Sequence, residues 1–231
     1  MPILECKSLS KQFGTVRALA GVNLTVEAGR VVGLLGPNGS GKTTLIKLAN
    51  GLLTPTGGEI LINGEKPSPG TKAIVSYLPD KEYLPDWMSA RRLMDFFADF
   101  YADFDRVRAS EMLGRLGVDE TMTVKHMSKG TREKVQLILV MSRRARLYLL
   151  DEPIGGVDPA TRDYILDTII RSYNPEAAVV ISTHLIADVE QVLDDVIFIQ
   201  NGEILLCSSV DAIREEKGMS VDRYFREVFR C

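Results

Sequence analysis

The chain has 231 residues, a length that fits one large domain or two small lobes. Hydrophobic residues make up 45% and charged residues 26%, which excludes disordered and collagen-like chains, and the apolar runs are far shorter than the roughly 20 residues of a membrane-spanning helix. Because of these short apolar runs, and because Glu5 and Lys7 interrupt any signal-like apolar region, we expect a soluble, cytosolic protein. The net charge of −3 disfavours binding to nucleic acid or to an anionic membrane.

The first 85 residues predict strands around one helix. Two segments alternate apolar and polar residues as half-buried strands do, a third is a short apolar run, and a fourth ends in the turn sequence Asn63-Gly64. The helical pattern, residues 45–52, follows the third of these strands. The predicted strands are residues 3–9, 20–26, 31–35 and 59–63.

Between residues 86 and 146 the sequence predicts helices. Five aromatic residues recur there at the three-to-four-residue spacing of one helix face. We expect most of this aromatic stripe to pack in the core of a helical lobe, and the alternative that part of it lines a docking groove stays open. The stripe consists of Phe96, Phe97, Phe100, Tyr101 and Phe104.

Short buried strands return after the helical stretch, with helical segments between them, and two short amphipathic stretches follow Cys207. Strand–helix alternation on both sides of a helical insert predicts an α/β fold: a parallel-sheet core that carries a helical lobe. The later strands are residues 147–150, 178–182 and 196–200. The expected boundaries are 1–85 and 145–206 for the core, 86–144 for the helical lobe and 207–231 for a short helical tail.

A glycine-rich loop follows the buried strand at residues 31–35. Residues 36–43 read GPNGSGKT and match the phosphate-loop pattern G-x-x-x-x-G-K-[ST] at every fixed position. Successive backbone N–H groups of such a loop, together with the N-terminus of the next helix, bind phosphate. The loop therefore predicts nucleoside triphosphate binding, with Lys42 on the β- and γ-phosphates and the Thr43 hydroxyl on Mg²⁺. The expected phosphate contacts are Gly36, Pro37, Asn38, Gly39, Ser40, Gly41, Lys42, Thr43 and Thr44.

Polar groups follow two further buried strands. Asp151 and Glu152 end the apolar run Leu147–Leu150, and His184 follows residues 178–183. Ligands of parallel α/β sheets sit at the carboxyl ends of the strands. We therefore expect Asp151 to hold Mg²⁺, Glu152 to polarise an attacking water, and His184 to contact the γ-phosphate.

The cysteines and histidines predict no further site. Cys6, Cys207 and Cys231 are too few and too scattered for a disulfide framework or a zinc site, and we expect them to be free thiols. His126 and His184 cannot build a metal site by themselves.

At this point nearly the whole chain resembles the ATP-binding subunits of ABC transporters. The most diagnostic stretch is residues 127–131, Met-Ser-Lys-Gly-Thr, upstream of Asp151, which is similar to the family signature Leu-Ser-Gly-Gly-Gln. The resemblance implies a P-loop, RecA-like α/β core with an N-terminal antiparallel β-subdomain and an inserted helical subdomain. It also implies an ATPase that uses ATP and Mg²⁺.

The resemblance further implies a dimer, with the same subunit or with a related one, in which two ATP molecules are sandwiched head to tail. The signature residues of one subunit would face the phosphate loop of the other. Phe13 would stack on adenine, Asp158 would lie in the loop that crosses between subunits, and Asp80 takes the place of a glutamine that senses Mg²⁺. The signature positions are Ser128, Lys129, Gly130 and Thr131, and the metal positions are Thr43, Asp80 and Asp151.

Several positions depart from the family pattern. Lys129 replaces a glycine, Thr131 and Asp80 replace glutamines, and Ile154-Gly155 replaces Thr-Ser. Lys129 adds positive charge where a phosphate would dock, and Asp80 remains an oxygen ligand suited to Mg²⁺. We therefore expect catalysis to be intact and signalling to the helical lobe to differ.

The resemblance implies a separate transmembrane permease as partner, no nucleic acid, and a location at the inner face of the cell membrane. Degenerate signatures of this kind occur in bacterial antibiotic- and peptide-efflux subunits, which favours export. The alternative is a soluble, non-transport ABC ATPase of the cluster-assembly type. Copurification with a membrane protein or with a soluble scaffold distinguishes the two.

Overall fold

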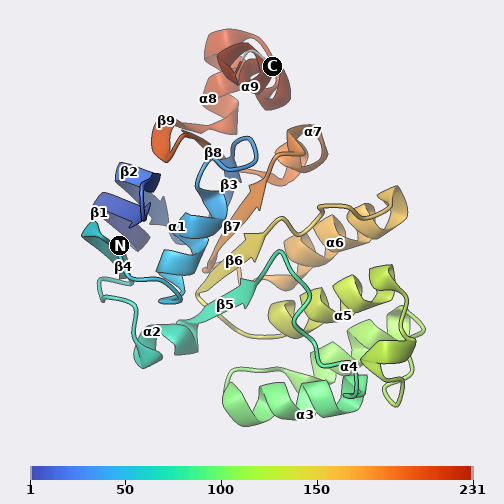
Figure 1. The fold of residues 1–231 in the computed structure, drawn as a ribbon. Helices are drawn as coiled ribbons and strands as arrows, with labels where there is room; N and C mark the ends of the chain where they lie inside the picture. The colour runs from blue at the N-terminus through green and yellow to red at the C-terminus, as the bar shows by residue number, and fades with distance from the viewer. Residues whose placement is uncertain (1, 230–231) are drawn as a thin grey trace.

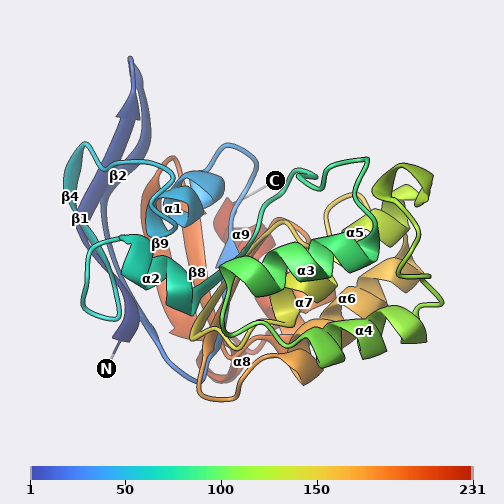
Figure 2. The ribbon, with the colours of Figure 1, turned by 90° about the horizontal axis from the view of Figure 1, so that it is seen from below.

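Two β-sheets form the framework of the protein, and helices cover the larger one (Figure 1). The structure is a computed structural model that describes residues 2–229, so Cys231 and its predicted free thiol lie outside the described residues. The smaller sheet and the helical lobe lie on opposite sides of the larger sheet in both views (Figure 1, Figure 2).

The smaller sheet is antiparallel, as predicted for the N-terminal subdomain. Its strand order is β2-β1-β4. The β1–β2 hairpin is longer than the alternation indicated, because pairing continues up to the Gly14 turn (φ 56°). Asn63 and Gly64 have φ values of 51° and 82°, which confirms the predicted turn. The strands are β1 (Pro2–Phe13), β2 (Val16–Glu27) and β4 (Gly57–Ile62).

The larger sheet has the order β5-β6-β7-β3-β8-β9 and is parallel except for β9, which pairs antiparallel with β8. Every residue of β3, β6 and β7 is buried, which explains their continuous apolar sequences. The strands are β3 (Val31–Leu35), β5 (Val75–Leu78), β6 (Leu147–Asp151), β7 (Ala178–Thr183), β8 (Asp195–Gln200) and β9 (Glu203–Ser209).

Two strands of this sheet were not predicted. The four-residue β5 contains the polar Ser76 and gives too short a pattern to detect. The edge strand β9 alternates exposed and half-buried residues and continues to Ser209. The helical tail therefore begins at Val210 rather than at residue 207, because β9 is held by its pairing with β8.

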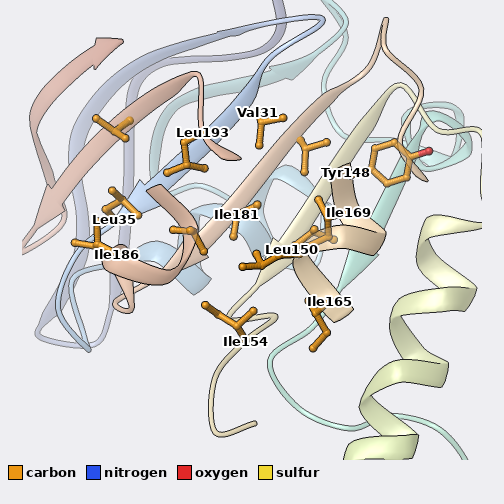
Figure 3. Packing of buried hydrophobic residues seen from close by; sticks show 14 of the residues in the cluster. Val31, Leu35, Tyr148, Leu150, Ile154, Ile165, Ile169, Ile181, Ile186 and Leu193 are labelled. Atoms are coloured by element: carbon orange, nitrogen blue, oxygen red, sulfur yellow. The ribbon is translucent and has the colours of Figure 1, made fainter. Parts of the chain in front are cut away.

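Side chains on the two faces of the large sheet belong to two separate hydrophobic clusters. Tyr148 and Leu150 of β6 point to one side, together with residues of helices α5 to α9, as Figure 3 shows for part of this cluster. Leu147 and Leu149 point to the other side, toward α1 and the smaller sheet. The helices that flank the core are α1 (Lys42–Ala49), α2 (Pro69–Ile74), α6 (Pro159–Ser172), α7 (Ile186–Val189), the 3₁₀ helix η2 (Glu190–Val192), α8 (Val210–Lys217) and α9 (Val221–Phe229).

The helical lobe forms as predicted and has its own buried cluster. Its helices begin at capping residues Ser89, Asp105 and Ser128, whose side chains accept backbone N–H groups three residues on. The lobe contains α3 (Ala90–Phe100), α4 (Arg106–Arg115), the 3₁₀ helix η1 (Val124–His126) and α5 (Lys129–Met141).

Some residues of the aromatic stripe pack in the lobe core, as expected, and others are exposed, as a docking groove would require. Phe97 is buried, and Tyr101 and Phe104 pack against the lobe core, each with its ring centroid 5.6 Å from that of Phe97. Phe96 and Phe100 are exposed and lie 4.5 Å apart between ring centroids. Core packing therefore holds for part of the stripe, while the rest faces solvent.

Arg143 joins the helical lobe to the core. Its guanidinium is buried, bonds both carboxylate oxygens of Asp103 at 3.0 and 3.2 Å, and donates to the carbonyls of Ala73 and Val75. It also lies 3.8 Å from the Tyr101 ring centroid. Among the residues that the structure describes, no helix is long and apolar enough to cross a membrane.

Candidate nucleotide site

Three neighbouring strands bring the predicted site residues to one edge of the large sheet. β6, β7 and β3 lie side by side, with Asp151 opposite Ser182 and Thr183 opposite Leu35. All three strands are parallel, so the residues that follow them emerge at the same edge. The phosphate loop, the Asp151-Glu152 pair and His184 therefore meet there, as the sequence predicted.

The phosphate loop requires glycine at its two ends. A Cβ on Gly36 would lie 2.3 Å from the Ile199 carbonyl oxygen, and one on Gly41 would lie 2.7 Å from the Ala18 carbonyl oxygen. Gly41 also has φ 113° and precedes α1, to which it supplies no capping side chain. The N–H groups at the start of α1 thus suit an anionic ligand.

Lys42 is folded back onto its own loop. Its side chain is only 5% exposed, and Nζ donates to the carbonyl oxygens of Gly36 at 2.7 Å and Pro37 at 3.2 Å. Nζ also lies 3.4 Å from Glu152 Oε1. A triphosphate would compete with these partners for the ammonium group.

Asp151 is held beneath the loop by two hydroxyl groups. Thr43 Oγ1 donates to Asp151 Oδ1 at 3.1 Å, and Ser182 Oγ donates to the same oxygen at 2.6 Å. Asp151 is 1% exposed, and burial raises the pKa of its carboxyl, an effect that the bonds from Ser182 and Thr43 oppose. Among the described residues, its Oδ2 is a buried atom without a hydrogen-bond partner.

These residues fit a magnesium ion. Asp151 Oδ2 has no hydrogen-bond partner among the described residues, and the Thr43 hydroxyl bonds the other oxygen of the same carboxylate. Mg²⁺ is usually bound by one or two carboxylates together with water and substrate phosphate. Within residues 2–229, no three His, Cys, Asp or Glu side chains form a metal cluster of their own. The donor set is therefore one that holds the ion together with a nucleotide.

Glu152 lies between a cation and the predicted histidine. Its backbone has φ 50°, an unusual value for a residue other than glycine, and its N–H donates to Ser182 O at 3.0 Å and to Ser182 Oγ at 3.1 Å. Its Oε1 faces Lys42, and its Oε2 lies 3.1 Å from His184 Nδ1. The Glu152 carboxylate therefore lies between the Lys42 ammonium group and the His184 ring.

A cavity of about 700 Å³ lies above these groups. Asp80 lines the cavity and is exposed, and its contact with Mg²⁺ stays a prediction. Phe13 is 45% exposed, does not belong to the described residues that line the cavity, and has Lys11 Nζ 4.9 Å from its ring centroid. Its adenine contact stays a prediction. The lining residues are Val16, Arg17, Ala18, Asn38, Gly39, Ser40, Gly41, Lys42, Thr43, Thr44, Asp80, Glu152, Gly155, Gly156, His184 and Asn201.

The predicted signature lies at the start of α5, and its residues are not among the described residues that line the cavity, although a Cβ on the lining residue Gly156 would lie 3.6 Å from Lys129 Nζ. Ser128 caps the helix by accepting the Thr131 N–H at 3.1 Å, and Lys129 pairs with Glu133 at 3.6 Å. Asp158 caps α6 in the same manner through Thr161. Ser128, Lys129 and Asp158 are exposed at the surface.

Sequence reasoning missed two sets of contacts. Ser182 holds both Asp151 and the Glu152 backbone, yet it reads as an ordinary residue of a buried strand. Val16, Arg17 and Ala18 line the cavity from β2, which the phosphate-loop pattern does not include. Ser182 meets Asp151 through the pairing register of β6 and β7, for which the sequence carries no signal.

The buried strand β3, the glycine loop and the following helix α1, together with the two carboxylates at the end of β6, define a P-loop protein. Residues 19–155 match the sequence profile of the family described as ABC transporter. A solved structure described as the ATP-binding subunit of an ABC transporter matches with a TM-score of 0.87 and 30% identity, over 98% of this chain and 99% of its own.

Curated relatives agree with this match. The ABC transporter ATP-binding protein YtrB of Bacillus subtilis is 30% identical over 217 residues, which cover 93% of this chain and 74% of that protein. The daunorubicin resistance ATP-binding protein DrrA3 of Streptomyces coeruleorubidus is 28% identical over 216 residues, covering 90% and 68%. The chain belongs to the ABC transporter family, with the α/β P-loop fold that the sequence predicted.

Proposed function

We propose that the chain binds ATP in the 700 Å³ cavity and hydrolyses it with Mg²⁺. The observation that carries the proposal is the shared position of Lys42, Glu152 and His184 around one cavity that also contains the Thr43 hydroxyl. Thr43 and Asp151 would hold the ion, with Asp80 close by. When bound, Mg²⁺ would neutralise charge on the phosphates.

Glu152 is the proposed general base. Its carboxylate pairs with Lys42 at 3.4 Å, and phosphate oxygens would draw that ammonium group away. The freed carboxylate can then accept a proton from a water that attacks the γ-phosphate, as the bond from that phosphorus to the leaving ADP oxygen breaks. His184, which lies 3.1 Å from Glu152 Oε2, would hydrogen-bond the γ-phosphate.

Two copies, or this chain and a related subunit, would close around two ATP molecules. Ser128 and Gly130 lie at the start of the thirteen-residue α5, where backbone N–H groups favour an anion. Lys129 adds a cation there and is largely exposed. Docked against a second phosphate loop, these residues would complete its site.

A separate transmembrane permease is the proposed partner, and it would hold the chain at the inner face of the membrane. A groove of about 440 Å³ runs between the core and the helical lobe and includes the exposed Phe96 together with Leu52 and Tyr83. An apolar groove of this kind suits a short helix of the permease. Export is the proposed direction, supported by the signature departures and by the name of the daunorubicin resistance relative.

Phosphate release from ATP by the purified chain tests this function. We expect turnover in the presence of Mg²⁺ and none in excess EDTA. Absence of turnover at saturating ATP and Mg²⁺, both for the chain alone and for the chain with a membrane protein that copurifies with it, would contradict hydrolysis. Copurification with a soluble scaffold instead of that membrane protein would favour the non-transport alternative.

Replacing Asp80 tests whether it acts through the ion. The carboxylate lines the cavity near Asp151, so we expect Asp80→Ala to lower turnover by about tenfold or more and to raise the Mg²⁺ concentration needed for half-maximal rate. ATP affinity, measured by calorimetry without Mg²⁺, should change little. Asp86→Ala, from the same loop outside the lining residues, is the control. Wild-type turnover and Mg²⁺ response in Asp80→Ala would remove Asp80 from the site.

A further inference from the structure

The segment that carries His184 has little structure of its own. Only eleven residues, 184–194, connect the end of β7 to the start of β8. They contain the four-residue α7 and the three-residue η2. Helices this short are unstable in isolation, because nucleation costs more than one turn of hydrogen bonds returns. We call residues 184–194 the His184 segment. Its position must therefore be set by the elements that pack against it.

The C-terminal helices supply that packing. Ile186 and Val189 of α7 are buried in the same cluster as Ile213 of α8 and Val221 of α9. Figure 1 shows α7 beside the α8–α9 pair, and Figure 3 places Ile186 beside Leu35 at the end of β3. One face of the His184 segment thus rests on residues 210–229, which we call the tail hairpin.

Glu190 fastens the segment to both helices of the tail hairpin. Its side chain is 12% exposed; Oε1 accepts from Arg214 Nη2 of α8 at 3.3 Å, and Oε2 accepts the Asp222 N–H of α9 at 3.2 Å. Asp222 lies in the first turn of α9, where a carboxylate is stabilised by the unpaired N–H groups. A single side chain thereby joins three helical elements.

A second ion pair holds the segment from the opposite side. Asp188 accepts from Arg162 Nη1 at 2.6 Å, and Arg162 belongs to α6, whose capping residue is Asp158. Asp188 and Glu190 thus anchor the segment to the α6 helix and to the tail hairpin. His184 itself remains 41% exposed and reaches toward Glu152.

We propose that the tail hairpin positions His184, and that Glu190 and Arg214 are positioning residues for ATP hydrolysis. The inference rests on the proposed function, because it assumes that His184 contacts the γ-phosphate. The tail hairpin is far from the phosphate loop in sequence and lines no part of the cavity among the described residues. Weakening the contact between the tail hairpin and the His184 segment would therefore slow hydrolysis and leave ATP binding unchanged.

A double-mutant cycle on the full chain tests the proposal. Glu190→Ala should reduce kcat by about tenfold or more, since displacements of a catalytic group by about 1 Å have effects of this size. The KM for ATP and the calorimetric ATP affinity should stay within about twofold of wild type. In a His184→Ala background, Glu190→Ala should cause no further loss, because the group that it positions is gone.

Two further variants test whether the loss of kcat comes from the contact between Glu190 and the tail hairpin. Arg214→Ala removes a half-exposed partner of Glu190, should fold normally, and should lower kcat by about three- to tenfold. Arg223→Ala removes an exposed arginine of α9 that pairs only within its own helix at 3.7 Å, and should leave kcat unchanged. Unchanged kcat in both Glu190→Ala and Arg214→Ala, or equal losses with and without His184, would overturn the proposal. Wild-type turnover in His184→Ala alone would instead overturn the proposed role of His184.

Discussion

Replacing Glu152 with glutamine is expected to reduce ATP turnover by at least about 100-fold, the lower end of general-base contributions. The amide keeps the shape of the side chain and can still accept from Lys42, but it cannot take a proton from water. Asp151 and Thr43 are untouched, so ATP should still bind with Mg²⁺. Single-turnover phosphate release and calorimetry measure the two effects separately.

Glu203→Gln is the matched control, because Glu203 begins the edge strand β9 and is exposed. It should hydrolyse ATP at the wild-type rate. A Glu152→Gln protein that also retains wild-type turnover would remove Glu152 as the base and would leave the attacking water to another group of the cavity.

Weaker ATP binding is the expected result for Lys42→Ala. The ammonium group is buried at the loop, and charge-assisted hydrogen bonds of this kind contribute about 1.5–3 kcal/mol, so affinity should fall by about 10- to 100-fold. Glu152 Oε1 would also lose the ammonium group that it faces. Calorimetric titration with ATP and Mg²⁺ gives the dissociation constant directly.

Lys47→Ala changes the same helix at its far end and should leave that constant unchanged. Since both substitutions remove one positive charge from α1, a general electrostatic effect would weaken binding in both variants. Affinity unchanged in Lys42→Ala would show that the ammonium group does not contact the nucleotide.

The sequence predicts most of the phosphate site because its chemistry is local. The loop, its strand and its helix are contiguous, and the polar groups after β6 and β7 follow from strands that end at one edge. Fold class follows in the same way from strand–helix alternation. The resemblance adds the antiparallel subdomain, which the pairing of β1 with β2 and β4 confirms.

Contacts between distant parts of the chain were not predictable. The Ser182 hydroxyl reaches Asp151 only because β6 and β7 pair in one particular register. Glu190 meets Arg214 and α9 because the tail folds back over the sheet, and periodicity carries no information on that docking. The weakly patterned strands β5 and β9 escaped detection because pairing with their neighbours, rather than their own sequence, holds them.

We propose that ATP holds two subunits together through the phosphate loop of one and the α5 N-terminus of the other. Comparing Ser128→Asp with Ser128→Asn distinguishes an effect on this contact from a loss of α5 stability. Aspartate and asparagine both cap a helix as well as serine does, but only aspartate would place a negative charge against the phosphates. ATP that is bound only by the closed dimer should shift the equilibrium toward it.

Light scattering during size-exclusion chromatography of Glu152→Gln, with and without ATP and Mg²⁺, is the most direct measurement. We expect the 25.6 kDa monomer without ATP and twice that mass with it. Adding Ser128→Asp should abolish the dimer, and adding Ser128→Asn should preserve it. A Glu152→Gln protein that binds ATP and stays monomeric at saturation, or a dimer that persists with Ser128→Asp, would contradict the head-to-tail arrangement.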